Sequence, residues 1–421
     1  MKEIVNFLIK VNRLKEMSRT GWVLAGIKNP ETVAEHVFGT AIASWLLGEK
    51  KGLEIKKLIQ TSFAHEFCEV YAGDITPILY YPKLPEDKEK RKKILMKWAR
   101  LLEKEKKRIG EKKFEIEKKS FLKLIKPLPA KLKKEFLILW LGYKKGFLKE
   151  GKFVRQINRI DTLLQSIVYF GTKDIHDRTN WWEWTEEIVE DELLLDFLFV
   201  VQSKFYRELV GKSKGKEELK NILNFLLKIN KLKKMPRTLW ALMKIKQPET
   251  VAGHIFSVTL MSWVFGQMKT NLNLEKVLKM ALCHEFPSVY TGDLITPFRI
   301  RKEKGKIFQK WPRLSKKEKF KIFFEDFKKE KNALKKLVSK LKPSFKKEIL
   351  SLWEEYKKNL TLEAHFVNQM NVLAVLLQGL FYKKRYKKLP LDWMWEWAFE
   401  RCDDPIILEF IEVLNKKFSS S

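Results

Sequence analysis

Apolar residues recur along most of the chain at the three- and four-residue spacing of amphipathic helices. Leucine, lysine and glutamate are abundant, while only 18 glycines and 14 prolines interrupt the pattern. The first apolar segment, from Met1 to Phe7, has a helical period and lacks the continuous apolar core of a signal peptide. The pattern therefore predicts an all-α protein.

Two predicted helices carry polar residues that suggest chemistry. Asn29 is expected to cap the first of them, with Pro30 at its first helical position and His36 near its start. The second is expected to run from about residue 53 to residue 71 and to stop at Gly73. On that helix His65 and Glu69 are four residues apart and share a face.

The sequence contains a long internal repeat. Residues 6–47 resemble residues 224–265, and the similarity resumes at 152–158 and 365–371. Both halves end in a tryptophan cluster followed by a further helix. Units of this length are duplicated domains rather than solenoid repeats. We predict a first domain at 1–210, a linker at 211–218 and a second domain at 219–421.

The chain has only six histidines, and four of them occupy two positions of the repeat. These are His36 and His65 in the first half and His254 and His284 in the second, and a glutamate follows the second histidine of each pair. Two imidazoles and a carboxylate on neighbouring helices are a usual ligand set for a divalent transition metal. Hydrogen-bonded structural histidines are the alternative interpretation.

The net charge of +33 is concentrated in two lysine-rich helical inserts. Residues 83–152 contain 25 Lys/Arg and 10 Asp/Glu, and residues 299–347 contain 20 and 5, so these segments supply 30 of the 33 charges. They are either solvated helix faces or surfaces that attract phosphate-bearing ligands, nucleic acid included. No apolar run reaches the roughly 18–20 residues of a membrane span. The three cysteines are not spaced as a disulfide framework, and we expect a cytoplasmic protein without membrane contact.

Several motifs together resemble the HD-domain phosphohydrolases, in the branch that includes 5′-deoxynucleotidases. The residues that carry the resemblance are Arg19-Thr20-Gly21-Trp22, Pro30-Glu31-Thr32-Val33-Ala34-Glu35-His36, Ala64-His65-Glu66, Gly73-Asp74-Ile75-Thr76-Pro77 and Phe153-Val154-Arg155-Gln156-Ile157-Asn158. The resemblance covers nearly all of both halves. It implies two all-α HD-type domains, each with a lysine-rich insert and each built around a metal held between helices.

The resemblance also implies a role for individual residues. The metal, of which Mn, Co, Fe, Zn and Mg are all candidates, is expected to be bound by His36, His65, Glu66 and Asn158. Acids that handle the attacking water and the leaving group correspond to Glu69 and Asp74. An arginine that contacts the substrate phosphate corresponds to Arg19. Trp22 is expected either to stack on the sugar or base or to pack in the core.

The sequence departs from the family pattern at two ligand positions. The family's His-Asp pair is His65-Glu66 here, and its last ligand, an aspartate, is Asn158. An amide oxygen coordinates without bringing a charge, so we expect weaker metal binding. Asp161 lies one turn beyond Asn158 on the same helix face, and it is either an alternative ligand or a solvated or capping acid near the site.

The second half is predicted to hold a degenerate copy of the site. Its corresponding residues are Arg237, His254, His284, Glu285, Asp293 and Asn371. Ser288 replaces Glu69, and Ala374 replaces Asp161. We therefore expect a vestigial metal site there, or none.

Three functions remain open at this level. The first is a metal-dependent phosphomonoesterase acting on a small substrate, a nucleoside 5′-monophosphate and more specifically a deoxynucleotide. The second is a catalytically silent protein of the same family that binds nucleotide, or nucleic acid through its basic inserts. The third is a structural or scaffolding protein. The retained acids Glu69 and Asp74 favour the first, and the sequence leaves the oligomeric state open.

Overall fold

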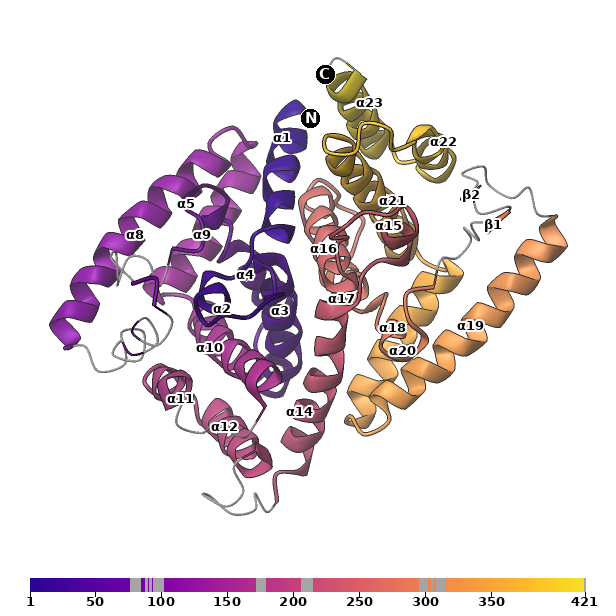
Figure 1. The fold of residues 1–421 in the computed structure, drawn as a ribbon. Helices are drawn as coiled ribbons and strands as arrows, with labels where there is room; N and C mark the ends of the chain where they lie inside the picture. Colours follow the sequence, from indigo (N-terminus) through magenta and orange to yellow (C-terminus); the bar gives the residue numbers. More distant parts are fainter. Residues whose placement is uncertain are drawn as a thin grey trace. The chain divides into compact units, whose positions relative to one another are not determined.

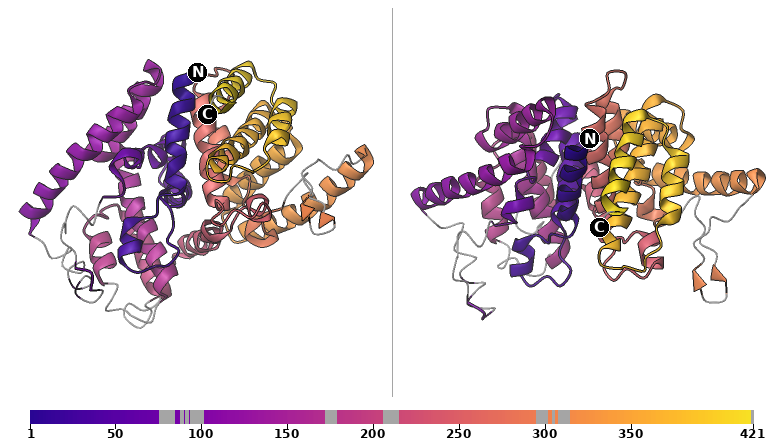
Figure 2. Two further views of the ribbon diagram at one scale, coloured as in Figure 1. Left: turned by 45° about the horizontal axis from the view of Figure 1, so that its top comes forward. Right: turned by 90° about the horizontal axis from the view of Figure 1, so that it is seen from above.

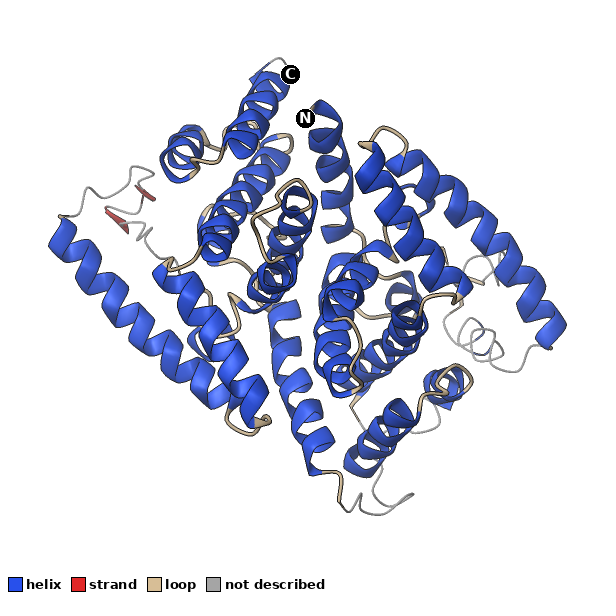
Figure 3. Ribbon diagram, turned by 180° about the vertical axis from the view of Figure 1, so that it is seen from behind, coloured by secondary structure: helices blue, strands red, loops and turns tan. Residues whose placement is uncertain are grey.

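The computed structural model describes residues 1–75, 85–87, 90, 93, 102–171, 179–205, 215–294, 302–303, 306–307 and 315–419. In these residues the protein is helical, apart from one antiparallel pair of two-residue strands, β1 (Lys302–Glu303) and β2 (Lys306–Ile307) (Figure 3). The all-α prediction is confirmed. Half of the predicted linker, residues 211–214, and parts of both lysine-rich inserts lie outside the described residues.

The chain forms two compact units, of which the first spans residues 13–227. It opens with the end of a short 3₁₀ helix, η1 (Asn12–Lys15). Its helices are α2 (Thr20–Leu24), α3 (Val33–Lys50), α4 (Ile55–Ala64), α5 (Glu69–Ala72), α8 (Glu103–Ile125), α9 (Ala130–Lys145), α10 (Lys149–Phe170), α11 (Thr179–Glu186), α12 (Glu192–Phe205) and residues 217–227 of α14 (Glu217–Ile229) (Figure 1).

The second unit consists of residues 1–12 and 228–421. It repeats the order of the first unit from a second 3₁₀ helix onward. Its elements are α1 (Lys2–Val11), η3 (Asn230–Lys234), α15 (Thr238–Leu242), α16 (Val251–Gly266), α17 (Leu274–Cys283), α18 (Ser288–Thr291), the strands β1 and β2, α19 (Lys316–Val338), α20 (Pro343–Lys358), α21 (Leu362–Lys383), α22 (Asp392–Arg401) and α23 (Pro405–Ser419).

The first helix of the chain belongs to the second unit. Helix α1 packs against α23, and Figures 1 and 2 both show the indigo N-terminal helix beside the yellow C-terminal one. Lys417 Nζ donates a hydrogen bond to Asn6 Oδ1 at 2.7 Å. At the end of α1 the buried Asn12 Nδ2 donates to Gln378 Oε1 at 3.0 Å. A buried amide pair of this kind ties α1 specifically to α21.

The sequence counterpart of α1 is α14, and most of α14 belongs to the first unit. Glu218 accepts a hydrogen bond from Lys50 Nζ at 2.6 Å, and Asn224 Oδ1 accepts one from Lys204 Nζ at 2.6 Å. Each unit therefore contains the first helix of the other repeat. The domain boundaries predicted from the sequence, at residues 210 and 219, instead assign each first helix to its own repeat.

Helix α3 is the centre of the first unit. Every residue from Val33 to Gly48 is buried, and the helix packs against both α4 and α10. Helix α16 has the same place in the second unit, between α17 and α21. A helix that is apolar on all sides is stable only where neighbours cover every face. The few polar residues on α3 and α16, His36 and His254 among them, are therefore held in a dry environment.

Helix α3 begins three residues later than predicted, so the assignment of Asn29 as N-cap is wrong. Thr32 is the N-cap: its side chain accepts from the backbone N–H of Glu35, while the Glu35 carboxylate accepts from the backbone N–H of Thr32. This reciprocal capping box satisfies two N–H groups that a helix start leaves unpaired. It fixes the start of the helix one turn before His36.

The single helix predicted over residues 53–71 is also wrong, because the structure breaks it at the histidine. Helix α4 ends at Ala64, and α5 begins only at Glu69. In between, three-residue hydrogen bonds from Phe67 N to Ala64 O and from Glu69 N to Glu66 O tighten the backbone. Gly73, with φ of 74°, then ends α5 in a conformation that favours glycine. The tight turn places Glu66 beside the histidines.

No single helix in the described part of the chain is long and apolar enough to cross a membrane. One bent pair, α20 with α21, passes that test on length and composition alone.

Gly151 marks the closest approach of α10 to α9, and its substitution gives a test of this packing. A Cβ atom at Gly151 would lie 2.4 Å from the carbonyl oxygen of Gly142, which backbone atoms cannot relieve by a side-chain rotation. We expect Gly151→Ala to lower the free energy of unfolding by about 2–3 kcal/mol. The matched Gly110→Ala, at an exposed helical glycine with nothing within 4 Å, should raise it by about 0.5–1 kcal/mol. Chemical denaturation measures both, and equal effects would contradict the packing.

Candidate active site

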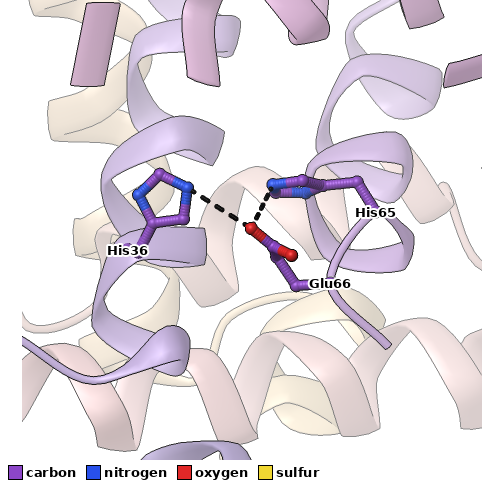
Figure 4. A group of neighbouring side chains, drawn as sticks. All are labelled: His36, His65 and Glu66. Atoms are coloured by element: carbon purple, nitrogen blue, oxygen red, sulfur yellow. Dashed lines mark ion pairs between the residues drawn. The ribbon is translucent and has the colours of Figure 1, made fainter. Parts of the chain in front are cut away.

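Two histidines and a glutamate from neighbouring elements converge in the first unit (Figure 4). His36 comes from α3, His65 caps the end of α4, and Glu66 is the next residue. Glu66 Oε1 lies 3.2 Å from His65 Nε2 and 3.7 Å from His36 Nε2. All three side chains are buried, so they form one compact polar group inside the helical core.

The two imidazole nitrogens that face Glu66, His36 Nε2 and His65 Nε2, are buried. Neither makes a hydrogen bond within the described part of the chain, although each lies at ion-pair distance from Glu66 Oε1. The opposite nitrogen of each ring is engaged: His65 Nδ1 lies 2.7 Å from the carbonyl oxygen of Ser62, and His36 Nδ1 lies 2.9 Å from Asp161 Oδ2. An unpaired buried polar atom is costly, so a pair of them aimed at one carboxylate points to a bound group. Two imidazoles and a carboxylate fit a divalent metal ion.

Asp161 lies on the other side of the His36 ring from Glu66. It comes from α10, is buried, and contacts Nδ1 of His36 rather than Nε2, the atom that faces Glu66 and His65. His36, His65 and Glu66 are called the candidate trio below. The carboxylates of Glu31 and Asp161 lie with His36 in a second compact group. The metal role predicted for Asp161 stays a prediction, since its printed contact is with the nitrogen that points away from Glu66 and His65.

An arginine and two further acids adjoin the trio. Arg19 Nη1 donates to Glu66 Oε1 at 3.0 Å and lies 3.9 Å from Glu69 Oε1. Arg19 Nε lies 3.8 Å from Asp74 Oδ2. The structure therefore places the predicted phosphate-binding residue and both predicted catalytic acids beside the candidate ligands.

The two acids have different surroundings. Asp74 Oδ2 accepts a hydrogen bond from the backbone N–H of Thr20 at 2.8 Å, at the start of α2, and its carbonyl oxygen accepts one from the Thr20 hydroxyl at 2.5 Å. Glu69 Oε2 is buried and makes no hydrogen bond to the residues that the structure describes. Asp74 is thus committed to the loop that carries Arg19, whereas Glu69 has an oxygen available.

Burial and charge shift the pKa values of this cluster in opposite directions. Burial raises the pKa of the Glu69 carboxyl well above its usual value, and the negative charges of Glu66 and Asp74 add to the effect. Burial also acts to raise the pKa of Glu66, but His65 and Arg19 outweigh it and hold that pKa well below the usual range. Burial lowers the pKa of His65. The neutral form of the imidazole, which is the form that binds metals, is favoured.

Asn158 contacts Tyr143, and this tyrosine in turn contacts His65 of the trio. Its Nδ2 donates to the hydroxyl of Tyr143 at 2.7 Å, and the Tyr143 ring lies 4.9 Å from the ring of His65, centroid to centroid. The amide nitrogen is therefore turned toward Tyr143. Metal ligation by the Asn158 oxygen stays a prediction.

Trp22 lies in an aromatic cluster rather than at the trio. It is 2 % exposed, and its Nε1 donates to Glu31 Oε1 at 3.0 Å. Its ring packs on Trp181 and Tyr169, with centroids 4.7 Å and 5.2 Å away. These contacts fit the packing alternative; contact with a sugar or base stays a prediction.

The second unit contains the equivalent of the candidate trio. His254, His284 and Glu285 lie together, but Glu285 Oε1 is 4.0 Å from His284 Nε2. Arg237 Nη1 donates to Glu285 Oε1 at 2.9 Å and to Asp293 Oδ1 at 2.7 Å. Arg19 contacts Glu66 in the same way at 3.0 Å, so the units differ in the distance from the glutamate to the second histidine, which is 3.2 Å in the first unit and 4.0 Å in the second.

Sequence reasoning missed two residues of the site. Tyr143 contacts both His65 and Asn158, and Thr20 binds Asp74. A signal was present for the tyrosine, because Tyr356 occupies the same position of the repeat and contacts His284 and Asn371 in the same way. The repetition of this tyrosine, 15 residues before the asparagine in each half, could have identified it as part of the site.

The fold and the site define an all-α domain that holds a candidate divalent-metal group of histidines and an acid between its helices. The chain belongs to the HD-domain family, whose model matches residues 11–191 and 229–393. The tandem arrangement of two HD-type domains predicted from the repeat is confirmed by these two matched segments. HD domains are typically metal-dependent, and the histidine–glutamate groups fit that requirement.

Curated relatives resemble about half of the chain. The 5′-deoxynucleotidase HDDC2 of Xenopus laevis is 29% identical over 169 residues, which are 40% of this chain and 73% of that protein. HDDC2 of Homo sapiens is 25% identical over 203 residues, 48% of this chain and 88% of its own length. The 5′-deoxynucleotidase YGK1 of Saccharomyces cerevisiae is 28% identical over 200 residues, 44% and 81% respectively. Together with the family match, these relatives support a hydrolase of the HD type.

Proposed function

We propose that the first repeat is a metal-dependent phosphomonoesterase that hydrolyses a nucleoside 5′-monophosphate, with deoxynucleotides preferred. The observation that carries the proposal is the buried group of His36, His65 and Glu66 with Arg19 Nη1 3.0 Å from Glu66 Oε1. The candidate metal ligands and the arginine proposed to bind phosphate thus lie next to one another. The names of the relatives, all 5′-deoxynucleotidases, support the substrate class.

In this proposal His36, His65 and Glu66 hold the metal, and Asn158 adds a neutral oxygen. A bound divalent ion supplies a water of lowered pKa and neutralises phosphate oxygens. Arg19 binds the non-bridging oxygens of the phosphate through its planar guanidinium group. The buried position of the group excludes bulk water, which strengthens each of these charge interactions.

The two acids divide the remaining work. In this proposal Glu69, whose Oε2 makes no hydrogen bond to the described residues and which lies 3.9 Å from Arg19, exchanges a proton with the attacking water or with the leaving 5′-oxygen. Asp74, bonded to the backbone of Thr20, holds the start of α2 and so positions the neighbouring Arg19. We therefore assign proton transfer to Glu69 and a positioning role to Asp74.

A second function is favoured by the two ligand substitutions. Glu66 and Asn158 stand where the resemblance leads one to expect aspartates, and the amide removes one negative charge from the site. A domain with this change that binds nucleotide without hydrolysing it is the competing proposal.

Phosphate release from a panel of nucleotides separates the two functions. The intact protein is incubated with deoxy- and ribonucleoside 5′-monophosphates, and with 3′-monophosphates as controls, in the presence of Mn²⁺, Co²⁺, Zn²⁺ or Mg²⁺. We expect release from the 5′-monophosphates alone, and its loss on chelation. Nucleotide binding without release under any of these metals would favour the silent binder.

Asn158→Asp tests the weakened ligand set. The substitution adds one negative charge beside the candidate metal, and the Tyr143 hydroxyl can donate to the new carboxylate. We expect metal affinity to rise about tenfold, with a gain in phosphate release. The matched Asn371→Asp in the second unit should leave phosphate release unchanged. Unchanged metal affinity in Asn158→Asp, measured by titration calorimetry, would remove Asn158 from the ligand set.

A further inference from the structure

The hydrogen-bond partners of His36 specify which of its nitrogens carries the proton. Nδ1 lies 2.9 Å from Asp161 Oδ2, and both side chains are buried. An ionised carboxylate only accepts hydrogen bonds, so Nδ1 must be the donor. In a neutral imidazole the other nitrogen, Nε2, then presents a lone pair toward Glu66 and His65.

The equivalent histidine of the second unit has the opposite arrangement. Nε2 of His254 lies 2.8 Å from Asn371 Oδ1, while Asn371 Nδ2 donates to the Tyr356 hydroxyl at 3.0 Å. In this orientation of the amide, its oxygen faces the ring of His254. An amide oxygen accepts, so the neutral His254 ring donates from Nε2. The nitrogen equivalent to the ligand atom of His36 thus carries a proton.

The two units also differ at one position of the repeat on this helix. Asp161 in the first unit corresponds to the buried Ala374 in the second, so the carboxylate that contacts His36 has no counterpart at that position. The glutamate also has a different neighbour, because Glu285 Oε2 accepts from Ser288 Oγ at 3.1 Å, whereas Glu69 occupies the position of this serine in the first unit. The contact with the arginine is common to both units.

We propose that Asp161 is a positioning residue that holds His36 in the Nδ1-protonated tautomer and so makes Nε2 a metal ligand. In this proposal Asn371 holds His254 in the other tautomer, and metal binding is confined to the first unit. The inference rests on the proposed function in that it takes His36 as a ligand. It adds a reason why two similar trios are expected to differ in metal affinity, namely the position of the proton on each histidine ring.

Metal affinity and tautomer state test this in the full-length protein. Asp161→Ala copies the second unit, and we expect it to lower the affinity for Co²⁺, measured by titration calorimetry, up to about 100-fold. Asp161→Asn keeps the shape and an acceptor oxygen without the charge, so a smaller loss of about tenfold is expected. Thr162→Ala, a neighbour on α10 whose hydroxyl binds the Asn158 carbonyl, is the control for local packing and should leave affinity unchanged.

Nitrogen NMR of ¹⁵N-histidine-labelled, metal-free protein supplies the second readout. We expect the His36 signals to report a proton on Nδ1 and the His254 signals a proton on Nε2, assigned with His36→Gln and His254→Gln. Asp161→Ala should abolish the preference for Nδ1 at His36. Wild-type affinity in Asp161→Ala, or a proton on His36 Nε2 in the unsubstituted protein, would overturn the proposal.

These readouts are independent of turnover. If no nucleotide is hydrolysed yet Co²⁺ binding still depends on Asp161, the proposed function fails and the tautomer proposal stands. If 5′-monophosphates are hydrolysed and Asp161→Ala retains its metal, the tautomer proposal fails and the function stands.

Discussion

The His65→Ala variant is expected to lose most of the bound metal and with it phosphate release. His65 is 1 % exposed, and its Nε2 atom faces Glu66 without a hydrogen bond to any residue that the structure describes. Removing it leaves one imidazole and one carboxylate, which is a poor set for a divalent ion. The loss of affinity should exceed the roughly 10–100-fold that loss of a ligand's own hydrogen-bond partner costs. Metal content by mass spectrometry and phosphate release measure the two effects.

His284→Ala is the matched control, because His284 occupies the same position of the repeat. It is also buried, and its Nδ1 lies 2.7 Å from the Ala281 carbonyl, as His65 Nδ1 does from Ser62. Both substitutions leave a cavity of similar size, so their effects on thermal unfolding should be alike. Only His65→Ala should change bound metal and turnover. Equal metal loss from both variants, or a metal-free native protein, would contradict a functional difference between the repeats.

The helical class and the pairing of the histidines were predictable because both depend on local pattern. Apolar spacing specifies helices, and the internal repeat identifies His36 and His65 as one recurring unit. The start of α3 was not predicted, because Asn29 and Thr32 are both good caps and only the contact between Thr32 and Glu35 selects one. The end of α4 at Ala64 could not be predicted either, because the apolar residues keep their helical spacing as far as Tyr71.

The exchange of first helices could not be predicted from the repeat. Helices α1 and α14 have closely similar sequences, so either could in principle join either repeat. The choice rests on side chains from distant parts of the chain, such as the bonds from Lys417 to Asn6 and from Asn12 to Gln378. These tertiary contacts decide which unit each helix joins, because the similar sequences of α1 and α14 do not.

The ligand trio was predicted from residue type, but the roles of its neighbours depend on orientation. The sequence places Asp161 one turn beyond Asn158, but only the structure shows that its carboxylate contacts Nδ1 of His36. The direction of a carboxylate across two packed helices is a tertiary property that spacing does not encode. For the same reason the structure, and not the sequence, distinguishes Asp74, bound to Thr20, from Glu69.

Arg19→Ala is expected to abolish most of the activity while leaving the metal bound. The guanidinium group is the proposed clamp on the phosphate, and loss of one such charge-stabilising group costs about 100- to 1,000-fold in rate. Arg19 also shares the Glu66 carboxylate with the candidate metal, since its Nη1 lies 3.0 Å from Oε1. Its removal frees that oxygen, so metal affinity should stay the same or rise. His65→Ala, by contrast, loses metal and turnover together.

Arg237→Ala separates this catalytic effect from a structural one. Arg237 holds Glu285 and Asp293 as Arg19 holds Glu66 and Asp74, so each substitution leaves acids without their cation. Both variants should lose stability, by up to about 3–5 kcal/mol where the acids stay charged and buried. Arg19→Lys keeps the charge without the planar fork, and it should retain more stability than Arg19→Ala with a partial loss of rate. Thermal unfolding, metal content and kcat/KM are compared for all three variants. Equal loss of kcat/KM in Arg19→Ala and Arg237→Ala would show that the arginine acts on the fold, and unaltered kcat/KM in Arg19→Ala would exclude it as the phosphate clamp.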